Sequence, residues 1–264
     1  MMGTQDKPAE DAPGRLSSVA SALMVLKAFS AEEAEIGISA LGKRLGLAKS
    51  TVHRLAVTLA SEGFLEQNPE TGRYRLGLAL FSLGALVRKR MDVSNEARPL
   101  LGALRDKTQE AVRLAILSGD QIVFLYNLES SQAIGIMTYI GSQKPAYCTA
   151  EGRAMLAFAP AAQRAAVIGR PQAARTPKTL TDPGDLQRAL DDVRAAGHAV
   201  DDEECEVGVR GIGAPVRDLS GRVVAAVGLA GPVQRLTKKD LRALAPDVVG
   251  TADAISARLG YRAR

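Results

Sequence analysis

The most constraining stretch of this sequence runs from Ile38 to Gly77 and reads ISALGKRLGLAKSTVHRLAVTLASEGFLEQNPETGRYRLG. Ser39 is predicted to cap a short helix over ALGKRL. Gly46 is predicted to end it, because glycine accepts the left-handed conformation found after helix C-termini. A second helix is predicted from about Ala48 to Glu62. Two helices joined by a tight glycine turn are typical of a helix-turn-helix.

The second predicted helix has one apolar and one polar face. The apolar residues recur at helical spacing, and they are Val52, Leu55, Ala56 and Leu59. The polar residues occupy the opposite face and the leading turn, and they are Lys49, Ser50, Thr51, His53 and Arg54. Such a helix fits the DNA major groove, where its first residues meet base edges. A plain amphipathic helix inside a bundle is the alternative.

A short hairpin is predicted directly after this helix. Residues 64–67 and 73–76 alternate as strands do, around the turn-rich loop NPETG. Arg73 and Arg75 are predicted on one face of the second strand, with Tyr74 and Leu76 on the other. A hairpin in this position is a wing, whose arginines can reach the DNA backbone or the minor groove.

Charge is unevenly distributed along the chain. The net charge is +5, and residues 15–90 hold 11 Lys+Arg against 6 Asp+Glu. A basic excess in this third of the chain indicates an anionic polymer as partner, although a merely solvated surface would look similar. Residues 1–14 are polar and acidic, and we expect a disordered arm there and no signal peptide.

The composition excludes several classes of protein. The length of 264 residues suits two modest domains. Two distant cysteines outside any CxxC motif and only two histidines argue against a disulfide framework and against a metal site. We therefore expect a reducing, cytoplasmic setting, no metal and no cofactor. No apolar run approaches the roughly 20 residues that a membrane span needs.

Before the helix-turn-helix, SSVASALMVLKAFS predicts a helix with Val19, Ala22, Leu23 and Leu26 on its apolar face. After the hairpin, the stretch 76–91, LGLALFSLGALVRKRM, is apolar on most of its circumference. Such a helix must be buried on more than one side. We predict that residues 78–94 form a linker helix that packs on a second chain; packing on its own C-terminal domain is the alternative. A two-fold dimer also suits a palindromic DNA site.

The second half alternates predicted helices and strands. A hairpin is expected around Ser118-Gly119-Asp120, a further strand over AIGIMTYIG (133–141), and a helix capped by Thr149. An amphipathic helix ended by Gly197, two strands around Ser220-Gly221 and a final helix from about Thr237 follow. Helices packed on a mostly antiparallel sheet make an α+β domain.

The chain resembles the IclR-type bacterial transcription regulators. The resemblance rests on GLAKSTVHRLAVTLASEGFLE, GRYRLG, YCTAEGRAMLAF and GHAVDDEECEVGVRGIGAPVRDLSGRVVAAVGLAGP in this order. It implies a winged helix-turn-helix over residues 15–77, a linker, and a GAF-like effector-binding domain over residues 95–264. It also implies a homodimer or a dimer of dimers that binds double-stranded DNA and a small organic acid.

The resemblance also implies an effector pocket. Its residues would be the start of the TAEGRA helix, an acid of the DDEE run and the last two strands, namely Thr149, Ala150, Glu151, Asp201, Gly211, Gly228 and Ala230. Free amides at a helix start favour a carboxylate. Relatives that sense very small acids have polar or cysteine side chains at the three strand positions. Glycine and alanine there indicate a larger acid, with aromatic acids among the candidates, although these small residues also suit strand packing.

An enzyme is the alternative from another class. The sequence has no GxGxxG, GxxxxGK[ST], GxSxG or HExxH motif in the required context. Cys148, His198 and Asp201 could supply a nucleophile, a base and an orienting group, but each has a plainer structural explanation. The acidic run from Asp201 to Glu204 could bind a metal, although such runs usually form a solvated turn. A winged helix used for protein contacts is a third possibility. We expect a regulator and no catalytic residues.

Overall fold

The computed structural model describes residues 17–30, 33–89 and 92–262, so the predicted arm at 1–14 lies outside the described residues. The chain forms two compact units, residues 1–90 and 91–264. Each unit is described by itself. In the described residues, no helix combines the length and the apolar character that crossing a membrane would require.

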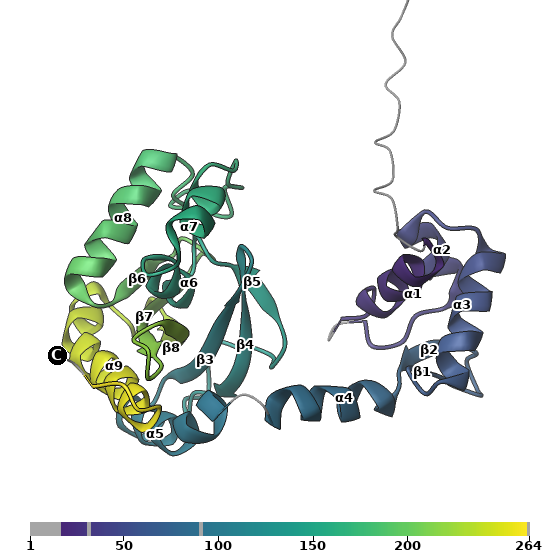
Figure 1. The fold of residues 1–264 in the computed structure, drawn as a ribbon, viewed down its shortest axis with the longest axis horizontal. Coiled ribbons are helices and arrows are strands. Elements are labelled where there is room, and N and C mark those ends of the chain that lie inside the picture. The colour runs from purple at the N-terminus through teal and green to yellow at the C-terminus, as the bar shows by residue number, and fades with distance from the viewer. Residues whose placement is uncertain (1–16, 31–32, 90–91, 263–264) are drawn as a thin grey trace, which may run out of the picture. The chain divides into compact units, whose positions relative to one another are not determined.

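The first unit is a winged helix-turn-helix (Figure 1). Its elements are α1 (Ser17–Lys27), α2 (Ile38–Leu45), α3 (Lys49–Ser61), β1 (Leu65–Gln67), β2 (Tyr74–Leu76) and α4 (Leu78–Lys89). The left-handed conformation of Gly46, with φ 66°, ends α2, as predicted. The amides of Gly46 and Leu47 both donate to the carbonyl of Gly42, which closes the turn before α3.

One small core holds this unit together. Its fully or nearly fully buried members are Val25, Ile36, Leu41, Val52, Ala56, Leu65 and Tyr74. The apolar face predicted for α3 is confirmed, because Val52 and Ala56 are buried and Leu55 and Leu59 pack beside them. Strands β1 and β2 pair antiparallel, and Tyr74 also pairs with Ile36, which ties the wing to the segment before α2.

Two local predictions in this unit were wrong. Ser39 does not cap α2; the helix begins at Ile38 after an extended Gly37 without a side-chain cap. In α1, Val25 is the buried residue, whereas Val19 and Leu23 are about half exposed, at 52% and 50%. Leu76 of the wing is also exposed, so only Tyr74 anchors that face of β2 in the core.

The second unit is a six-stranded sheet covered by helices on both faces. Its strands are β3 (Ala111–Ser118), β4 (Gln121–Leu128), β5 (Gln143–Pro145), β6 (Ala199–Asp202), β7 (Val209–Arg217) and β8 (Val223–Pro232). Its helices are α5 (Asp92–Thr108), α6 (Ala150–Leu156), α7 (Ala161–Ile168), α8 (Pro183–Ala196) and α9 (Lys238–Arg258). The strand order is β5-β4-β3-β8-β7-β6, with every pair antiparallel. This is the predicted α+β class.

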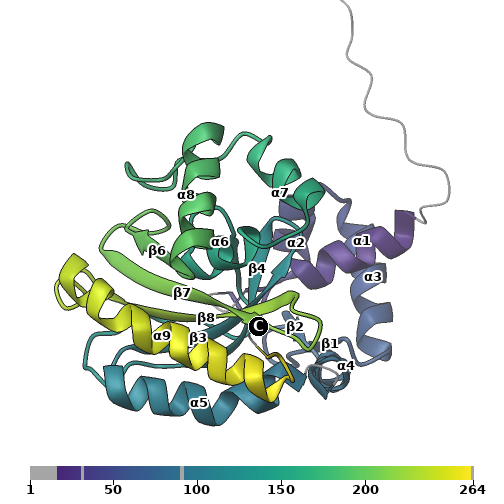
Figure 2. The ribbon, with the colours of Figure 1, turned by 60° about the vertical axis from the view of Figure 1, so that its left-hand side comes forward.

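The two faces of the sheet carry different helices. Figure 2 shows α5 and α9 on one face and α6, α7 and α8 on the other. Alternation along the strands sorts the residues: Ile212 and Leu229 join the core under α5 and α9, whereas Ala226 joins the core under α6. The side chains that the central strands present to α6 are small or absent, as at Gly211 and Gly213. Helix α6 can therefore approach the sheet closely.

Several predictions for this unit are confirmed, and one strand was misplaced. The hairpin turn at Gly119-Asp120, the end of α8 at Gly197, the start of α9 at Thr237 and the capping residue Thr149 agree with the structure. Residues 133–141 are not a strand; β5 forms instead over residues 143–145, between this segment and the cap of α6. Ile134 and Met137 in that segment are exposed, so its apolar character does not arise from burial in the sheet. Helix α7 was not predicted.

Candidate functional site

Helix α6 begins directly on the sheet. Thr149 caps it, since its Oγ1 accepts the Gly152 amide at 3.3 Å. A Cβ added to Gly213 of β7 would lie 2.6 Å from the Glu151 amide nitrogen, so the first turn of α6 rests against bare backbone. These two contacts occupy the space around the early amides of α6. The amides are therefore less open to a ligand than the sequence indicated.

The predicted effector positions converge on one small cavity beside this turn. Six of the seven line it, namely Thr149, Ala150, Glu151, Asp201, Gly211 and Ala230. The rest of the lining is Arg113, Lys144, Cys205, Glu206, Val209 and Arg210. The free volume is about 10 Å³, room for about one water molecule. A ligand can enter only if lining side chains move.

The space beside Gly228, the seventh predicted position, is not free for a ligand. A Cβ there would meet the Glu151 carboxyl group well inside the 3.0 Å that real Cβ contacts keep. The Glu151 side chain therefore fills the space that the missing side chain of Gly228 leaves. The glycine accommodates a residue of this chain, which corrects the expectation that a ligand would use this space.

Three ion pairs surround the cavity. Buried Arg113 places Nη2 2.8 Å from Oε1 of buried Glu151. Lys144 Nζ donates to Glu206 Oε1 at 2.7 Å. Arg210 Nε donates to Asp202 Oδ1 at 2.5 Å, just outside the lining. The Nε of Arg113 has no hydrogen-bond partner in the described part of the chain. A buried cation with a free donor is a candidate anion ligand.

The acidic run 201–204 is not the solvated turn that the sequence indicated. Asp201 lies in β6 and is 6% exposed, and Glu204 is 8% exposed. Arg153 of α6 donates to both carboxylate oxygens of Glu204, at 2.6 and 2.7 Å. Opposite charge and a bidentate geometry make burial of this pair tolerable.

Burial also changes the acidity of Asp201. Desolvation raises the pKa of its carboxyl group to about 7, against the lowering effect of hydrogen bonds from the Glu204 and Cys205 amides. Near neutral pH the Asp201 side chain is therefore protonated in about half of the molecules. Each basic side chain of the lining already has a carboxylate partner, Arg113 with Glu151, Lys144 with Glu206 and Arg210 with Asp202. A protonated Asp201 therefore adds no further negative charge to the cavity.

Sequence reasoning missed the basic residues of the site. Arg113 interrupts the apolar strand AVRLAILS, and it lies on the opposite face to Val112 and Leu114. A single arginine at an inward position of a buried strand was the available signal. Lys144 and Arg210 carried no comparable signal, because only the pairing of distant segments brings them to the cavity.

The predicted DNA-contact residues are all exposed on the first unit. The five predicted residues of α3, namely Lys49, Ser50, Thr51, His53 and Arg54, lie in its first two turns. The two wing arginines, which are also exposed, differ in their contacts. The Arg75 guanidinium lies 3.0 Å from Glu66 and 3.8 Å from Glu35. Cross-strand pairing of Glu66 with Arg75 holds this side chain along the wing.

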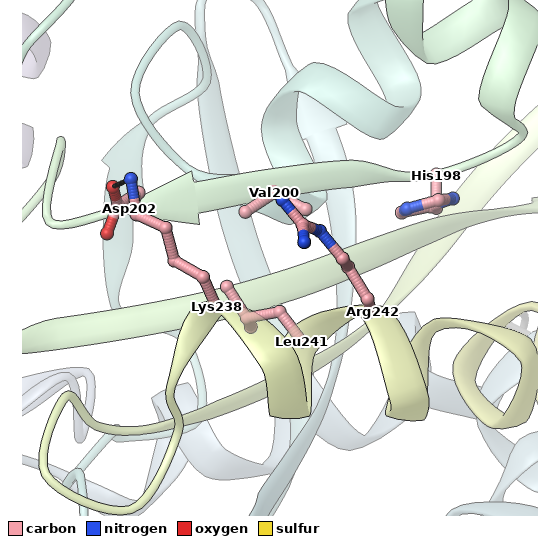
Figure 3. Close-up of a pocket in the computed structure, with 6 residues that line it drawn as sticks. All are labelled: His198, Val200, Asp202, Lys238, Leu241 and Arg242. Carbon is pink, nitrogen blue, oxygen red and sulfur yellow. Dashed lines mark ion pairs between the residues drawn. The ribbon is translucent and has the colours of Figure 1, made fainter.

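A second cavity lies at one edge of the sheet, between the edge strand β6 and helix α9 (Figure 3). Its volume is about 190 Å³, and it is lined by His198, Val200, Asp202, Lys238, Leu241 and Arg242. Lys238 extends from α9 to Asp202, with Nζ 2.9 Å from Oδ2 (Figure 3). Val200 belongs to the core under α5 and α9, so this cavity opens on the sheet face away from α6.

The position of His198 separates it from the other members of the imagined catalytic group. Its ring lines the cavity on the α9 face, and its Nδ1 lies 3.1 Å from the Ala196 carbonyl oxygen. Cys148 and Asp201 lie on the α6 side of the sheet. The three residues therefore do not form a nucleophile, base and orienting group. In the described residues, no cluster of three His, Cys, Asp or Glu side chains could hold a metal ion.

The chain is similar to known proteins over nearly its whole length. Residues 18–69 match the IclR helix-turn-helix domain, and residues 85–257 match the bacterial transcriptional regulator IclR C-terminal domain. The Escherichia coli regulator XynR is 34% identical over 249 residues, 94% of this chain and 99% of XynR. The E. coli regulator KdgR is 33% identical over 94% of this chain and 95% of its own length.

Solved structures agree with these relatives. A regulator from Alicyclobacillus acidocaldarius matches with a TM-score of 0.82 and 27% identity, over 93% of this chain and 100% of that chain. A homologue from Microbacterium hydrocarbonoxydans, solved with 4-hydroxybenzoate, has a TM-score of 0.81 and 26% identity over 92% and 99%. The winged helix-turn-helix, the helix-covered sheet and these relatives together show that the chain belongs to the IclR family of DNA-binding transcription regulators.

Proposed function

We propose that this protein is a dimeric regulator whose binding to DNA changes when a small organic acid enters the cavity beside α6. The proposal rests mainly on Arg113, a buried residue in the wall of that cavity. Its Nε lacks a hydrogen-bond partner in the described residues. In bacteria the DNA lies in the cytoplasm, where we propose that the protein acts.

We propose that DNA contacts come from α3 and the wing. The polar residues at the start of α3, Lys49, Ser50 and Thr51, are placed to meet bases and phosphates in the major groove. His53 and Arg54 continue the same exposed surface. Arg73 and Arg75 would contact the DNA backbone beside the groove. Because Arg75 already pairs with two carboxylates, we expect Arg73 to contribute more to DNA affinity.

We propose that α4 binds a second copy of the chain. Four of its apolar side chains are exposed, namely Leu78 (74%), Phe81 (72%), Leu83 (50%) and Leu86 (62%), and Leu80 lies half-buried among them. Side chains of this kind, repeated along one helix, form an apolar surface that a monomer would leave in water. A two-fold dimer would bury them and present two α3 helices to a palindromic site. A dimer of dimers would contain the same contact.

The charges of the cavity favour an acid as the ligand. Arg113 and Lys144 are held by Glu151 and Glu206, two carboxylates of the chain itself. A ligand carboxylate can replace Glu206 at Lys144 and reach the free Nε of Arg113, so that charge pairing is conserved when the cavity opens. Asp201, half protonated near neutral pH, adds no full opposing charge.

The ligand's size follows from how far the cavity opens. With about 10 Å³ free, lining side chains must move for any acid to enter, and we propose that the turn that carries Glu206 moves with them. Gly211 and Ala230 add no side chain that would block a flat ligand. A homologue with the same fold binds 4-hydroxybenzoate, and we therefore include aromatic acids among the effectors.

The test is calorimetry and thermal unfolding of the full-length protein against organic acids, each paired with its amide. 4-Hydroxybenzoate and 4-hydroxybenzamide form the first pair. A ligand that binds only the folded state raises the Tm. We expect an acid, but not its amide, to raise the Tm and to change the affinity for operator DNA. An amide that binds as tightly as its acid would contradict the proposal.

The variant Lys144→Met tests whether the acid binds in the cavity beside α6. It retains most of the apolar stem but removes the charge, so acid binding should weaken by roughly tenfold or more. Lys178→Met is the matched control, because Lys178 pairs with Glu203 at 2.6 Å but does not line the cavity. Equal effects of the two variants would exclude Lys144 as a carboxylate ligand.

A further inference from the structure

The only two cysteines of the sequence meet in the folded protein. Cys148 and Cys205 are separated by the whole of α6, α7, α8 and β6 along the chain, yet they pack in one buried cluster with Tyr147 and Leu186. Both are free thiols. Cys148 directly precedes Thr149, the cap of α6, and Cys205 lies in the turn after β6.

The two thiols differ in their tendency to lose a proton. A hydrogen bond with Cys205, together with burial, raises the pKa of the Cys148 thiol. The same hydrogen bond lowers the pKa of Cys205, and nearby Lys144 acts in the same direction against the effect of burial. Of the two thiols, Cys205 therefore loses its proton more readily, and the thiolate is the reactive form of cysteine.

Cys205 is also the member of the pair that solvent can approach. It lines the cavity beside α6 together with Lys144 and Glu206, whereas Cys148 is wholly buried behind it. A more acidic thiol at a cavity, with a second thiol packed next to it, is the arrangement in which a reactive and a resolving cysteine form a disulfide.

We propose that Cys148 and Cys205 are a reversible oxidation site, which a peroxide converts to an intrachain disulfide. The Cys205 sulfur attacks one peroxide oxygen, the O–O bond breaks, and the second oxygen leaves as hydroxide, which becomes water. This leaves Cys205 as a sulfenic acid. The Cys148 sulfur then attacks the Cys205 sulfur. The S–S bond forms, the S–O bond breaks, and the departing hydroxide takes the Cys148 proton as a second water.

The disulfide would fix the turn that closes the cavity. Residues 203–206 hold Glu204, which pairs with Arg153, and Glu206, which pairs with Lys144. A covalent bond from Cys205 to the residue before the α6 cap would tie this turn to α6. If ligand entry moves this turn, as proposed above, oxidation would exclude the ligand. This consequence rests on the proposed function, whereas disulfide formation does not.

The experiment uses the reduced full-length protein, treated with hydrogen peroxide and then alkylated after unfolding. Peptide mapping by mass spectrometry should find one linked peptide pair containing Cys148 and Cys205, formed within single chains and reversed by dithiothreitol. The oxidised protein should also melt at a higher temperature, because the bond restricts the unfolded chain. Wild-type mapping decides the question even if a cysteine variant folds poorly.

Two single variants assign the roles. In Cys148→Ala, Cys205 should give a sulfenic acid that dimedone traps. In Cys205→Ala, Cys148 should stay unreacted in the folded protein. Links formed only between chains, oxidation of either cysteine to sulfinic acid without a linked peptide, or two unmodified thiols after treatment that oxidises the unfolded chain would each overturn the proposal. These readouts need neither DNA nor ligand, so their failure is distinct from failure of the proposed function.

Discussion

The Glu151 carboxyl group lies directly over the Cα of Gly228, where β8 passes beneath the first turn of α6. This contact places Glu151 within 2.8 Å of Arg113 and closes the wall of the cavity. The glycine is therefore required by a neighbouring side chain of the chain itself.

Gly228→Ala should destabilise the protein. The added methyl group would displace Glu151 and disturb a buried ion pair, and overpacking of this kind costs about 1–3 kcal/mol. Denaturant unfolding of the full-length protein measures the loss. Gly102→Ala is the control, since a Cβ in that part of α5 meets nothing within 4 Å, and it should be neutral or stabilising by about 0.5–1 kcal/mol. Equal stabilities would show that Glu151 has room to move.

Arg54 and Arg73 should affect DNA binding differently. If Arg54 reads a base, Arg54→Ala should weaken operator binding by about 1–3 kcal/mol and relax specificity. Arg73→Ala should weaken binding to all sequences alike and reduce the salt dependence by about one phosphate contact. Fluorescence anisotropy at two salt concentrations measures both. Arg222→Ala, which removes an exposed arginine from the other unit, is the control, and wild-type affinity in both test variants would remove α3 and the wing from the interface.

The double variant Phe81→Glu/Leu83→Glu should dissociate the protein. Two carboxylates would have to be buried without partners in the proposed α4 contact, which is strongly unfavourable. Analytical ultracentrifugation should detect a smaller species, and operator affinity should fall. Leu219→Glu introduces the same charge at another exposed leucine and should leave the assembly unchanged. A double variant that sediments as the wild type would place the dimer contact elsewhere.

Asp201 should make the folded state less stable as pH rises. Its pKa of about 7 in the folded protein exceeds its ordinary value of 3.8, so the folded state binds the proton more tightly. The resulting stabilisation is complete below pH 4, declines as pH rises toward 7, and is lost above it. It is on the order of 4 kcal/mol at most. The difference in unfolding free energy between wild type and Asp201→Asn should change with pH between 5 and 8, and a constant difference would contradict the raised pKa.

The local patterns of the sequence determined the helix-turn-helix, the wing and most elements of the sheet. Periodicity predicted α3, because Val52 and Ala56 recur at the spacing that one helix face requires. The pattern was unreliable where an apolar run is not buried. Residues 133–141 resemble a strand, but a strand also needs a hydrogen-bonding neighbour, and such a partner is not visible in the local sequence.

The candidate effector site was only partly predictable. Resemblance to the family indicated Asp201 and the start of α6, and the structure brings these residues to one cavity. That Glu151 occupies the space over Gly228, that Arg113 faces Glu151, and that Cys148 meets Cys205 were decided by tertiary structure alone. The physical reason is that helix and strand patterns report on neighbours a few residues apart. Contacts across the sheet depend on strand order and register, which join residues tens of positions apart.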